Sequence, residues 1–187
     1  MDCIDAILKR RSVRKFTEKP VNASDIQRLL LAGASAPSAH NEQPWHFIVI
    51  NDVKIKEELA SKMMDAYIKS GKADERMAKR SYNITLNSPL IIIGCLDLRR
   101  LKYQNELEYK MGIQSLAAAA ENILLAAFCM GLTGFWRAAP LVTSDIIRSV
   151  LNIPDYIEPQ WMLHIGHAAA EPRAKELRND IIHWNGW

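Results

Sequence analysis

The pattern of apolar and polar residues along the chain predicts helices and strands in an irregular order. Apolar residues recur every three or four positions in several segments, which predicts helices over 4–8, 24–33, 55–68 and 103–130, and another from Thr143 or Ser144 through Leu151. Continuous apolar runs of strand length lie at 47–50, 89–96 and 161–165. Because strands and helices do not alternate regularly, the pattern favours an α+β fold over a doubly wound α/β fold.

Local signals refine these elements. Ser24 and Gln27 have the spacing of a capping box, and Gly131 is placed to end the longest helix. The strand at 89–96 is apolar on both faces, so we expect it at the centre of the sheet. Residues 71–80 are charged and weakly periodic, which predicts a surface excursion; whether residues 71–87 form a lid stays open.

Length and composition are typical of a globular protein. The chain has 187 residues, of which 49% are hydrophobic and 24% charged, so residues 1–187 can form one domain or one protomer of an intertwined dimer. The longest apolar stretch, Leu116–Phe135, contains Glu121 near its middle, which favours a core or interface helix over a membrane span. The amino-terminal pattern is not that of a secretory signal, and we expect a cytoplasmic protein without a membrane partner.

Positive charge is concentrated near the amino terminus in residues 9–19, here called the basic segment. It holds six lysines and arginines and one glutamate, a local balance of +5 in a chain of net charge +3. Arg10, Ser12 and Arg14 alternate, so an extended backbone would place them on one face. Guanidinium and hydroxyl groups of this kind bind phosphate oxygens. A compact patch fits a phosphate-bearing small molecule better than nucleic acid, although cations also occur at helix ends without any ligand.

A second candidate site is the loop before the first predicted strand. Residues 37–47 read Pro-Ser-Ala-His-Asn-Glu-Gln-Pro-Trp-His-Phe, and their amide and hydroxyl groups could bind a polar ring edge at the mouth of the strand. Pro44 predicts an extended backbone at Gln43. An ordinary turn after a helix would use the same residue types, so this interpretation remains beside the functional one.

These two segments resemble, in order and spacing, the motifs of the nitroreductase family of flavin mononucleotide (FMN) oxidoreductases. That family has an Arg-x-Ser-x-Arg/Lys segment and a Pro-Ser-x-x-Asn-x-Gln-Pro-Trp loop, which correspond to residues 10–14 and 37–45. Residues 131–137, Gly-Leu-Thr-Gly-Phe-Trp-Arg, are similar to a small-subfamily variant in which a Trp-Arg pair follows the glycines. A helix stop and a turn would explain the two glycines equally well.

The resemblance implies a fold, a cofactor and a reaction. The fold is α+β, with a central, mostly antiparallel sheet flanked by helices, in an intertwined homodimer with FMN at the subunit interface. The reaction carries hydride from NADH or NADPH through FMN to a nitroaromatic, quinone or similar small-molecule acceptor in a ping-pong cycle. The flavin performs the chemistry, so no side chain is assigned a catalytic role.

By the same resemblance, Arg10 and Ser12 would bind the FMN phosphate and ribityl chain. Arg14 would lie near the pyrimidine edge, where a fixed cation stabilises the negative charge of the reduced flavin. His40 is assigned no role. The loop would reach the flavin of the partner subunit, and a late basic residue would reach the phosphate. The complete set of candidate cofactor-binding residues is Arg10, Arg11, Ser12, Arg14, Pro37, Ser38, Ala39, Asn41, Gln43, Thr133, Gly134, Trp136, Arg137 and Arg173.

Other chemistries have little support in the sequence. His164 and His167 lie three apart on a predicted strand and so point to opposite faces, and no metal site is expected. The three cysteines have neither disulfide nor zinc spacing, and both the Gly-x-Ser-x-Gly and the Gly-x-Gly-x-x-Gly pattern are missing. The alternatives left open are a flavin-binding or regulatory protein with little turnover, a specialised flavin reductase or dehalogenase on the same scaffold, and a basic nucleic-acid-associated domain.

Overall fold

A computed structural model of the chain describes residues 2–71, 74–172 and 175–187. A four-stranded sheet with strand order β1-β2-β4-β3 forms its centre, and all neighbouring strands are antiparallel. The strands are β1 (Trp45–Ile50), β2 (Leu90–Asp97), β3 (Thr133–Arg137) and β4 (Ile157–Gly166). The helices are α1 (Cys3–Lys9), α2 (Ala23–Ala34), α3 (Val53–Lys69), α4 (Glu75–Leu86), α5 (Glu106–Cys129) and α6 (Pro140–Leu151). The predicted α+β architecture is confirmed.

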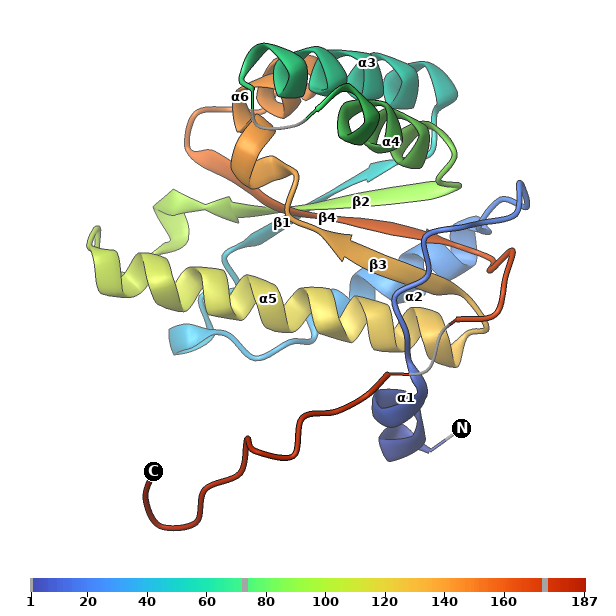
Figure 1. Ribbon diagram of the computed structural model, residues 1–187. Coiled ribbons are helices and arrows are strands. Elements are labelled where there is room, and N and C mark those ends of the chain that lie inside the picture. Colours follow the sequence, from blue (N-terminus) through green and yellow to red (C-terminus); the bar gives the residue numbers. More distant parts are fainter. Residues whose placement is uncertain (1, 72–73, 173–174) are drawn as a thin grey trace.

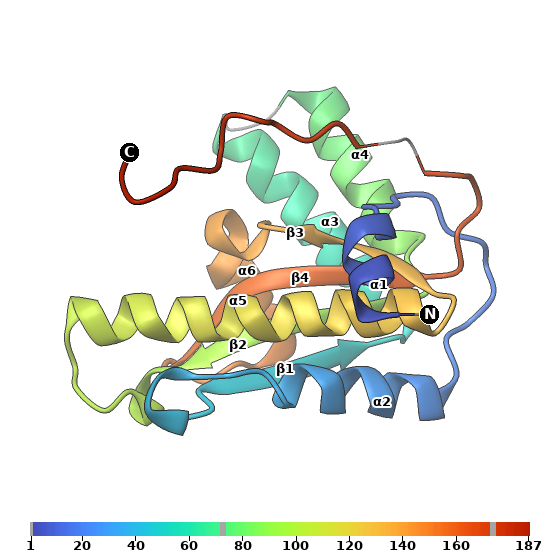
Figure 2. The same ribbon diagram turned by 90° about the horizontal axis from the view of Figure 1, so that it is seen from below.

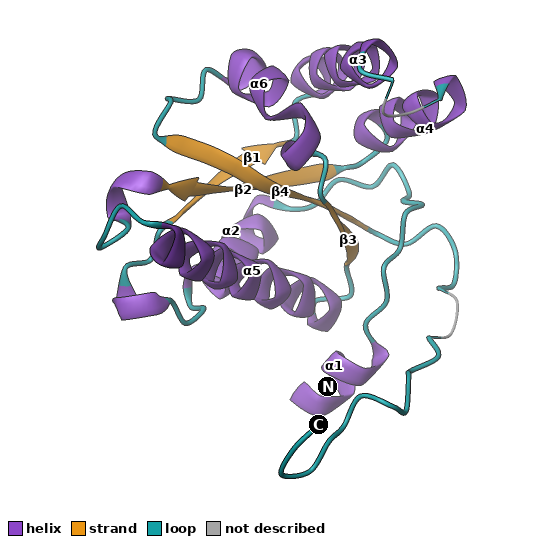
Figure 3. Cartoon of the chain, turned by 60° about the vertical axis from the view of Figure 1, so that its left-hand side comes forward, coloured by secondary structure: helices purple, strands orange, loops and turns teal. Residues whose placement is uncertain are grey.

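Each face of the sheet packs against its own helices. Helices α2 and α5 cover one face and α3, α4 and α6 lie on the other (Figures 1 and 3). Along β2, Leu90 and Ile92 belong to the core cluster with α5, whereas Ile91 and Ile93 belong to the cluster with α3 and α6. All four side chains are fully buried. The strand is therefore central and covered on both faces, as its continuous apolar run predicts.

The long helix α5 lies across the sheet, with α2 beside it (Figure 2). Its Ala119, Ala120 and Ile123 are fully buried, and Trp161 of β4 donates its indole N–H to the carbonyl oxygen of Leu116 at 3.1 Å. Among the described helices α5 alone is long and apolar enough to cross a membrane by length and composition. Its packing on the sheet and on α2 is that of a core helix, and Gly131 follows it with a φ of 74°, as a stop signal should.

Two helices begin elsewhere than predicted. Helix α2 begins at Ala23 with Asn22 as its N-cap, so Ser24 lies inside the first turn and the predicted capping box is wrong. Helix α6 begins at Pro140 and is kinked at Thr143, whose φ is −125°. The Thr143 hydroxyl donates to a backbone carbonyl of the preceding turn instead of capping a new helix.

The segment 71–80, predicted to be a surface excursion, is exposed apart from Ala78 among its described residues, and residues 72–73 lie outside them. The sequence did not predict that this segment becomes helical at Glu75, where α4 begins. The buried face of this helix consists of Ala78, Ser81 and Thr85. Charged residues dominate the first turns of this segment, and its buried face holds one apolar residue, Ala78, so the sequence offers few apolar positions from which to predict a helix. Helix α4 packs on α3, and the hydrogen bonds from Arg137 of β3 connect its small and polar face to the sheet.

The approach of Trp161 to β2 requires a glycine at position 94. A Cβ atom built at Gly94 would lie 2.1 Å from the Trp161 ring. We predict that Gly94→Ala lowers the free energy of unfolding by about 1–3 kcal/mol, the usual cost of overpacking a core. Urea unfolding measures this loss. Gly186→Ala is the matched control because nothing lies within 4 Å of its Cβ position; equal stability of both variants would contradict the prediction.

Candidate functional site

The basic segment runs along the outer edge of β3. Ser12 forms a parallel bridge with Gly134, and the Val13 N–H donates to the Gly134 carbonyl oxygen at 3.3 Å. Val13 is buried, whereas Ser12 and Arg14 are exposed. The predicted alternation is confirmed for Ser12 and Arg14, whose side chains face outward on either side of a buried valine, whereas Arg10 is half-buried at the carboxyl end of α1.

The first two arginines of the segment have partners within the chain. The Arg10 Nε atom lies 3.1 Å from the Glu121 carboxylate of α5, and this ion pair is partly exposed. Arg11 donates to the carbonyl oxygens of Leu8 and Arg10 at 2.6 and 2.7 Å. Arg11 therefore satisfies the carboxyl end of α1, which is the structural role that a cation at a helix end is expected to have.

Arg14 lies above an aromatic cluster. Its guanidinium carbon is 5.3 Å from the centroid of the Phe135 ring. Phe135 stacks on His164 with centroids 4.7 Å apart, and Phe16 stacks on Phe135 at 6.3 Å. Burial lowers the pKa of His164 well below its ordinary value, so this ring is neutral. The cluster provides a rigid apolar base beneath the only part of the basic segment that faces a large cavity.

That cavity has a volume of about 1000 Å³, which lies at the upper end of the range of roughly 300–1,000 Å³ for small-molecule sites. Part of its wall comes from the basic segment and part from α4. Its charged lining residues are Arg14, Lys15, Asp74, Arg76 and Arg80. The sequence predicts only a surface excursion at residues 71–80, so it gives no sign that α4 contributes to this cavity.

Arg137 joins β3 to the buried face of α4. Its guanidinium donates to the Thr85 hydroxyl at 2.9 Å and also to the Ser81 hydroxyl. One turn further, the Ser88 hydroxyl lies 2.8 Å from Nδ1 of His164 on β4. Burial lowers the pKa of Arg137 from its usual value. This predicted cofactor ligand thus has its guanidinium engaged with α4, where it orients the helix that lines the cavity.

The other predicted residues at this end of the sheet occupy different environments. Thr133 and Gly134 are buried, so they can meet a ligand mainly through the backbone. The Trp136 ring is 39% exposed and lies tilted against Trp161 at 6.0 Å. Arg173 lies outside the described residues.

The loop at residues 37–44, here called the amide loop, lies at the opposite end of the sheet from the basic segment. It enters β1 at Trp45, which pairs with Leu96 at the end of β2. The basic segment instead lies where β4 ends, and Ile165 there pairs with Leu90 at the start of β2. An eight-residue strand spans about 25 Å. Within one chain, the two candidate motifs are therefore too far apart to share one small ligand.

The backbone of the amide loop has a left-handed φ at three non-glycine residues, His40, Asn41 and Gln43, with values of 49°, 55° and 49°. The predicted extended conformation of Gln43 is wrong. Two hydrogen bonds hold the turn closed, from the Gln43 N–H to the Ser38 hydroxyl at 3.0 Å and from the Gln43 amide to Asn41 at 3.1 Å. Such backbone conformations persist only where surrounding contacts determine them.

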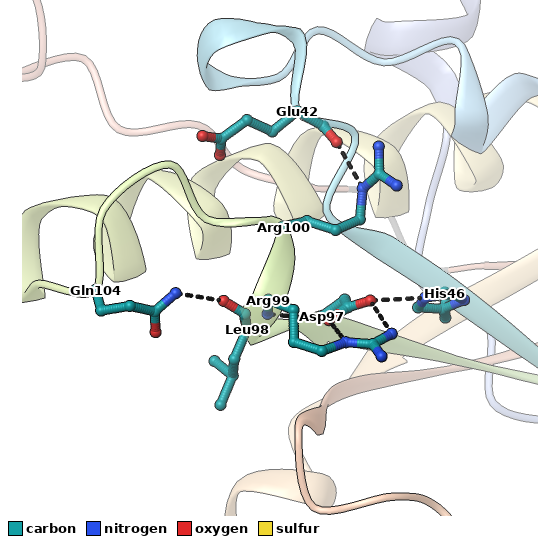
Figure 4. Close-up of polar contacts among 7 residues, drawn as sticks. All are labelled: Glu42, His46, Asp97, Leu98, Arg99, Arg100 and Gln104. Atoms are coloured by element: carbon teal, nitrogen blue, oxygen red, sulfur yellow. Dashed lines mark hydrogen bonds and ion pairs between the residues drawn. The ribbon is translucent and has the colours of Figure 1, made fainter.

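Those contacts come from both sides of the loop. Arg100 donates to the Glu42 carbonyl oxygen at 2.8 Å (Figure 4), and the Lys102 N–H donates to the Glu42 carboxylate at 2.6 Å. On the α5 side, the Ala39 N–H donates to the Ser115 hydroxyl at 3.1 Å. All residues from 37 to 43 remain at least partly exposed. The loop is thus fixed in shape while its side chains face outward.

Asp97 anchors the strand end beneath the amide loop. Its buried carboxylate accepts two hydrogen bonds from the Arg99 guanidinium, at 3.0 and 2.9 Å, and lies 3.3 Å from Nε2 of His46 (Figure 4). Its N–H donates to the Pro44 carbonyl oxygen at 2.9 Å. The hydrogen bonds from Arg99 are the main reason that the pKa of Asp97 falls to about 2.

The described residues contain neither a disulfide nor a metal cluster. His164 is fully buried within β4, whereas His167 follows Gly166, the last residue of that strand, and is partly exposed. No group of three His, Cys, Asp or Glu side chains among the described residues could hold a metal ion. Cys3, Cys95 and Cys129 are free, and burial raises the pKa of Cys95 to about 12. Cys95 is therefore an inert core thiol.

The chain belongs to the nitroreductase family, which matches residues 7–167. It is 32% identical over 192 residues to a candidate NADH dehydrogenase/NAD(P)H nitroreductase of Archaeoglobus fulgidus, covering 100% of this chain and 99% of that protein. A candidate protein of the same name from Parabacteroides distasonis has a crystal structure with 28% identity, 99% and 98% coverage and a TM-score of 0.79. An FMN-dependent nitroreductase of Clostridium difficile is similar at 25% identity, 98% and 99% coverage and a TM-score of 0.77.

The Asp97 cluster generates a prediction about acid stability. A carboxyl whose pKa is lowered by folding stabilises the fold while ionised, so its contribution is full above the usual value of 3.8 and is lost as the pH falls through about 2. Because Arg99 is largely exposed, we expect Asp97→Asn to cost about 1–2 kcal/mol at pH 7. The difference in unfolding free energy between wild type and Asp97→Asn, measured by urea unfolding, should become smaller as the pH falls from 4 to 2.

The control is Asp155→Asn, since Asp155 is fully exposed although it pairs with Arg148. An exposed pair of this kind contributes about 0–1 kcal/mol. If the loss of unfolding free energy in Asp97→Asn does not change with pH, it comes from altered packing and not from the lost charge.

Proposed function

We propose that the chain is an FMN-dependent NAD(P)H oxidoreductase, with residues 1–187 forming one nitroreductase-like domain that works as a cytoplasmic homodimer. Family membership supports the general reaction, and the similar proteins described above include a candidate NAD(P)H nitroreductase and an FMN-dependent nitroreductase. The observation that carries the proposal is the exposed Ser12 and Arg14 pair beside a cationic cavity of about 1000 Å³.

The residues present fit a phosphorylated flavin. Ser12 offers an exposed hydroxyl, Arg10 lies two residues before it, and Arg14 is held over Phe135 beside the cavity. In the proposal Arg10 and Ser12 hold the phosphate. The ion pair between Arg10 and Glu121 is partly exposed and therefore weak, so Arg10 can exchange it for a stronger charge-assisted contact with the phosphate. Arg14 holds the pyrimidine edge and stabilises negative charge there. Bound FMN supplies two-electron transfer between NADH or NADPH and an acceptor such as a nitroaromatic or a quinone.

A homodimer accounts for the separation of the two motifs. Because the amide loop and the basic segment lie at opposite ends of the sheet, one flavin can meet both only if they come from two chains. The strained and exposed residues Asn41 and Gln43 then face the partner's cofactor. Each dimer would contain two equivalent sites.

The carboxyl-terminal tail supports the same assembly. Residues 175–187 extend away from the sheet and the helices (Figures 1 and 3), and all of them are exposed. The tail carries large apolar side chains that a soluble chain rarely leaves in water, including Ile181, Ile182 and Trp184. A second copy of the chain would cover them.

The phosphate role predicts a loss of flavin affinity. Arg10→Ala and Ser12→Ala should each weaken FMN binding by about 1.5–3 kcal/mol, roughly ten- to a hundredfold, through loss of a charge-assisted contact. Fluorescence titration of the apoprotein with FMN measures the dissociation constant. Lys9→Ala is the control, since Lys9 is exposed and pairs with Asp5. Unchanged FMN affinity in both site variants would remove the phosphate assignment.

If the tail forms part of the proposed dimer interface, dimerisation should depend on its apolar residues. An obligate interface buries more than roughly 2,000 Å², so the double variant Ile181→Asp/Ile182→Asp should shift the dimer toward monomer in sedimentation velocity and release FMN. Val53→Asp/Ile68→Asp is the control because it places the same two charges at exposed apolar positions on α3. A wild-type monomer that binds FMN tightly would contradict the proposed interface.

Turnover separates this proposal from the alternative of a flavin-binding protein with little activity. Steady NADH or NADPH oxidation that accelerates on adding a nitro compound or a quinone is expected of the enzyme. A yellow protein whose flavin is reduced once and reoxidised only by air would favour the binding protein or a reductase specialised for another acceptor.

A further inference from the structure

The cavity beside Arg14 holds more positive charge than the proposed flavin roles use. Arg10, assigned to the phosphate, is not among its lining residues. Besides Arg14, the cavity has Lys15, Arg76 and Arg80 in its lining against the single carboxylate of Asp74. Two of these cations belong to α4, which has no part in the proposed phosphate clamp.

The two arginines of α4 have no carboxylate partner on their own helix, all of which lies in the described part of the chain. Arg76 and Arg80 are one turn apart, so they lie on the same side of the helix, and both are exposed. By contrast, one lysine on each of α1, α3 and α5 pairs with a carboxylate four residues before it. Among the described residues, no carboxylate forms an ion pair with Arg76 or Arg80, so their charge is available to a ligand.

The orientation of these arginines is set by the other side of α4. Ser81 and Thr85 accept hydrogen bonds from the Arg137 guanidinium and the helix packs on α3, and together these contacts restrict its rotation about its axis. The apolar part of the cavity comes from Phe16, Met77 and Ile84. A ligand with a flat apolar body and an acidic group matches this combination.

We propose that the cavity selects acceptors that carry an anionic group on a reducible aromatic ring, and that Arg76 and Arg80 bind this group. The inference rests on the proposed function and specifies the substrate class of the same site. A cleft lined by charge of one sign raises the local concentration of ligands of the opposite sign, and salt weakens the effect. The arginines thus act on binding of the acceptor and not on the transfer of electrons.

The test compares two acceptors that differ mainly in charge, 4-nitrobenzoate and 4-nitrobenzamide, on the FMN-loaded enzyme. We expect kcat/KM for 4-nitrobenzoate to be about tenfold higher than for 4-nitrobenzamide at low salt. The two values should become nearly equal at high salt. Arg76→Gln and Arg80→Gln should each reduce the low-salt preference for 4-nitrobenzoate severalfold, mainly through KM. Lys79→Gln is the matched control, because Lys79 is an exposed cation of α4 outside the cavity lining.

Calorimetry with benzoate and benzamide, which cannot be reduced, measures binding without turnover. Weaker benzoate binding in the two arginine variants, with Lys79→Gln like wild type, would support the inference. An unchanged benzoate preference in both arginine variants would overturn it, as would an equal effect of Lys79→Gln.

Flavin content, measured by absorbance, separates this inference from the proposed function. If Arg80→Gln loses FMN while the benzoate preference persists, α4 serves the cofactor and the inference is wrong, but the oxidoreductase proposal stands. If wild type binds no flavin, the proposed function fails, whereas a calorimetric preference for benzoate that needs Arg76 and Arg80 would still support an anion-selective cavity.

Discussion

The antiparallel register of the sheet is the constraint on which the proposed site depends. It places the amide loop where β1 begins and the basic segment where β4 ends, at opposite ends of strands about 25 Å long. Neither end alone has the features of a complete flavin site. One end has cations, a hydroxyl and a cavity, and the other has fixed amide groups facing outward. Two chains in a symmetric arrangement can combine them, which gives the exposed tail and the strained loop a common explanation.

The end of the sheet that carries the cavity depends on one half-buried guanidinium, that of Arg137. Arg137 crosses from β3 to α4 and binds two hydroxyls on a helix face that is otherwise small and polar. Apolar packing would let such a helix slide or rotate at little cost, whereas charge-assisted hydrogen bonds have strict geometry. The result is a helix whose rotation is specified and whose outer arginines point to one cavity. A residue expected to touch the cofactor thus also determines the charge of the site through its neighbours.

At the other end of the sheet, the amide loop depends on contacts that stabilise its unfavourable left-handed backbone conformation. Three left-handed non-glycine residues within four positions cost about 1–3 kcal/mol each in isolation. Hydrogen bonds from Arg100, the Lys102 N–H and the Asp97 N–H secure the loop from the turn that follows β2. Such a loop is already ordered before it meets a ligand or a partner, so less entropy is lost on binding.

The sequence by itself determined the fold class, the central strand and the two motifs, because these follow from apolar periodicity and from local residue chemistry. It did not reveal α4, because charged residues dominate that segment and its buried face of Ala78, Ser81 and Thr85 holds only one apolar side chain. It also misjudged Gln43, since Pro44 restricts that backbone locally but hydrogen bonds to Ser38 and Asn41 decide it. Only the tertiary structure decided that the motifs lie at opposite ends of the sheet and that the α4 arginines meet Arg14, because strand register and helix rotation are set by contacts between residues far apart in the chain.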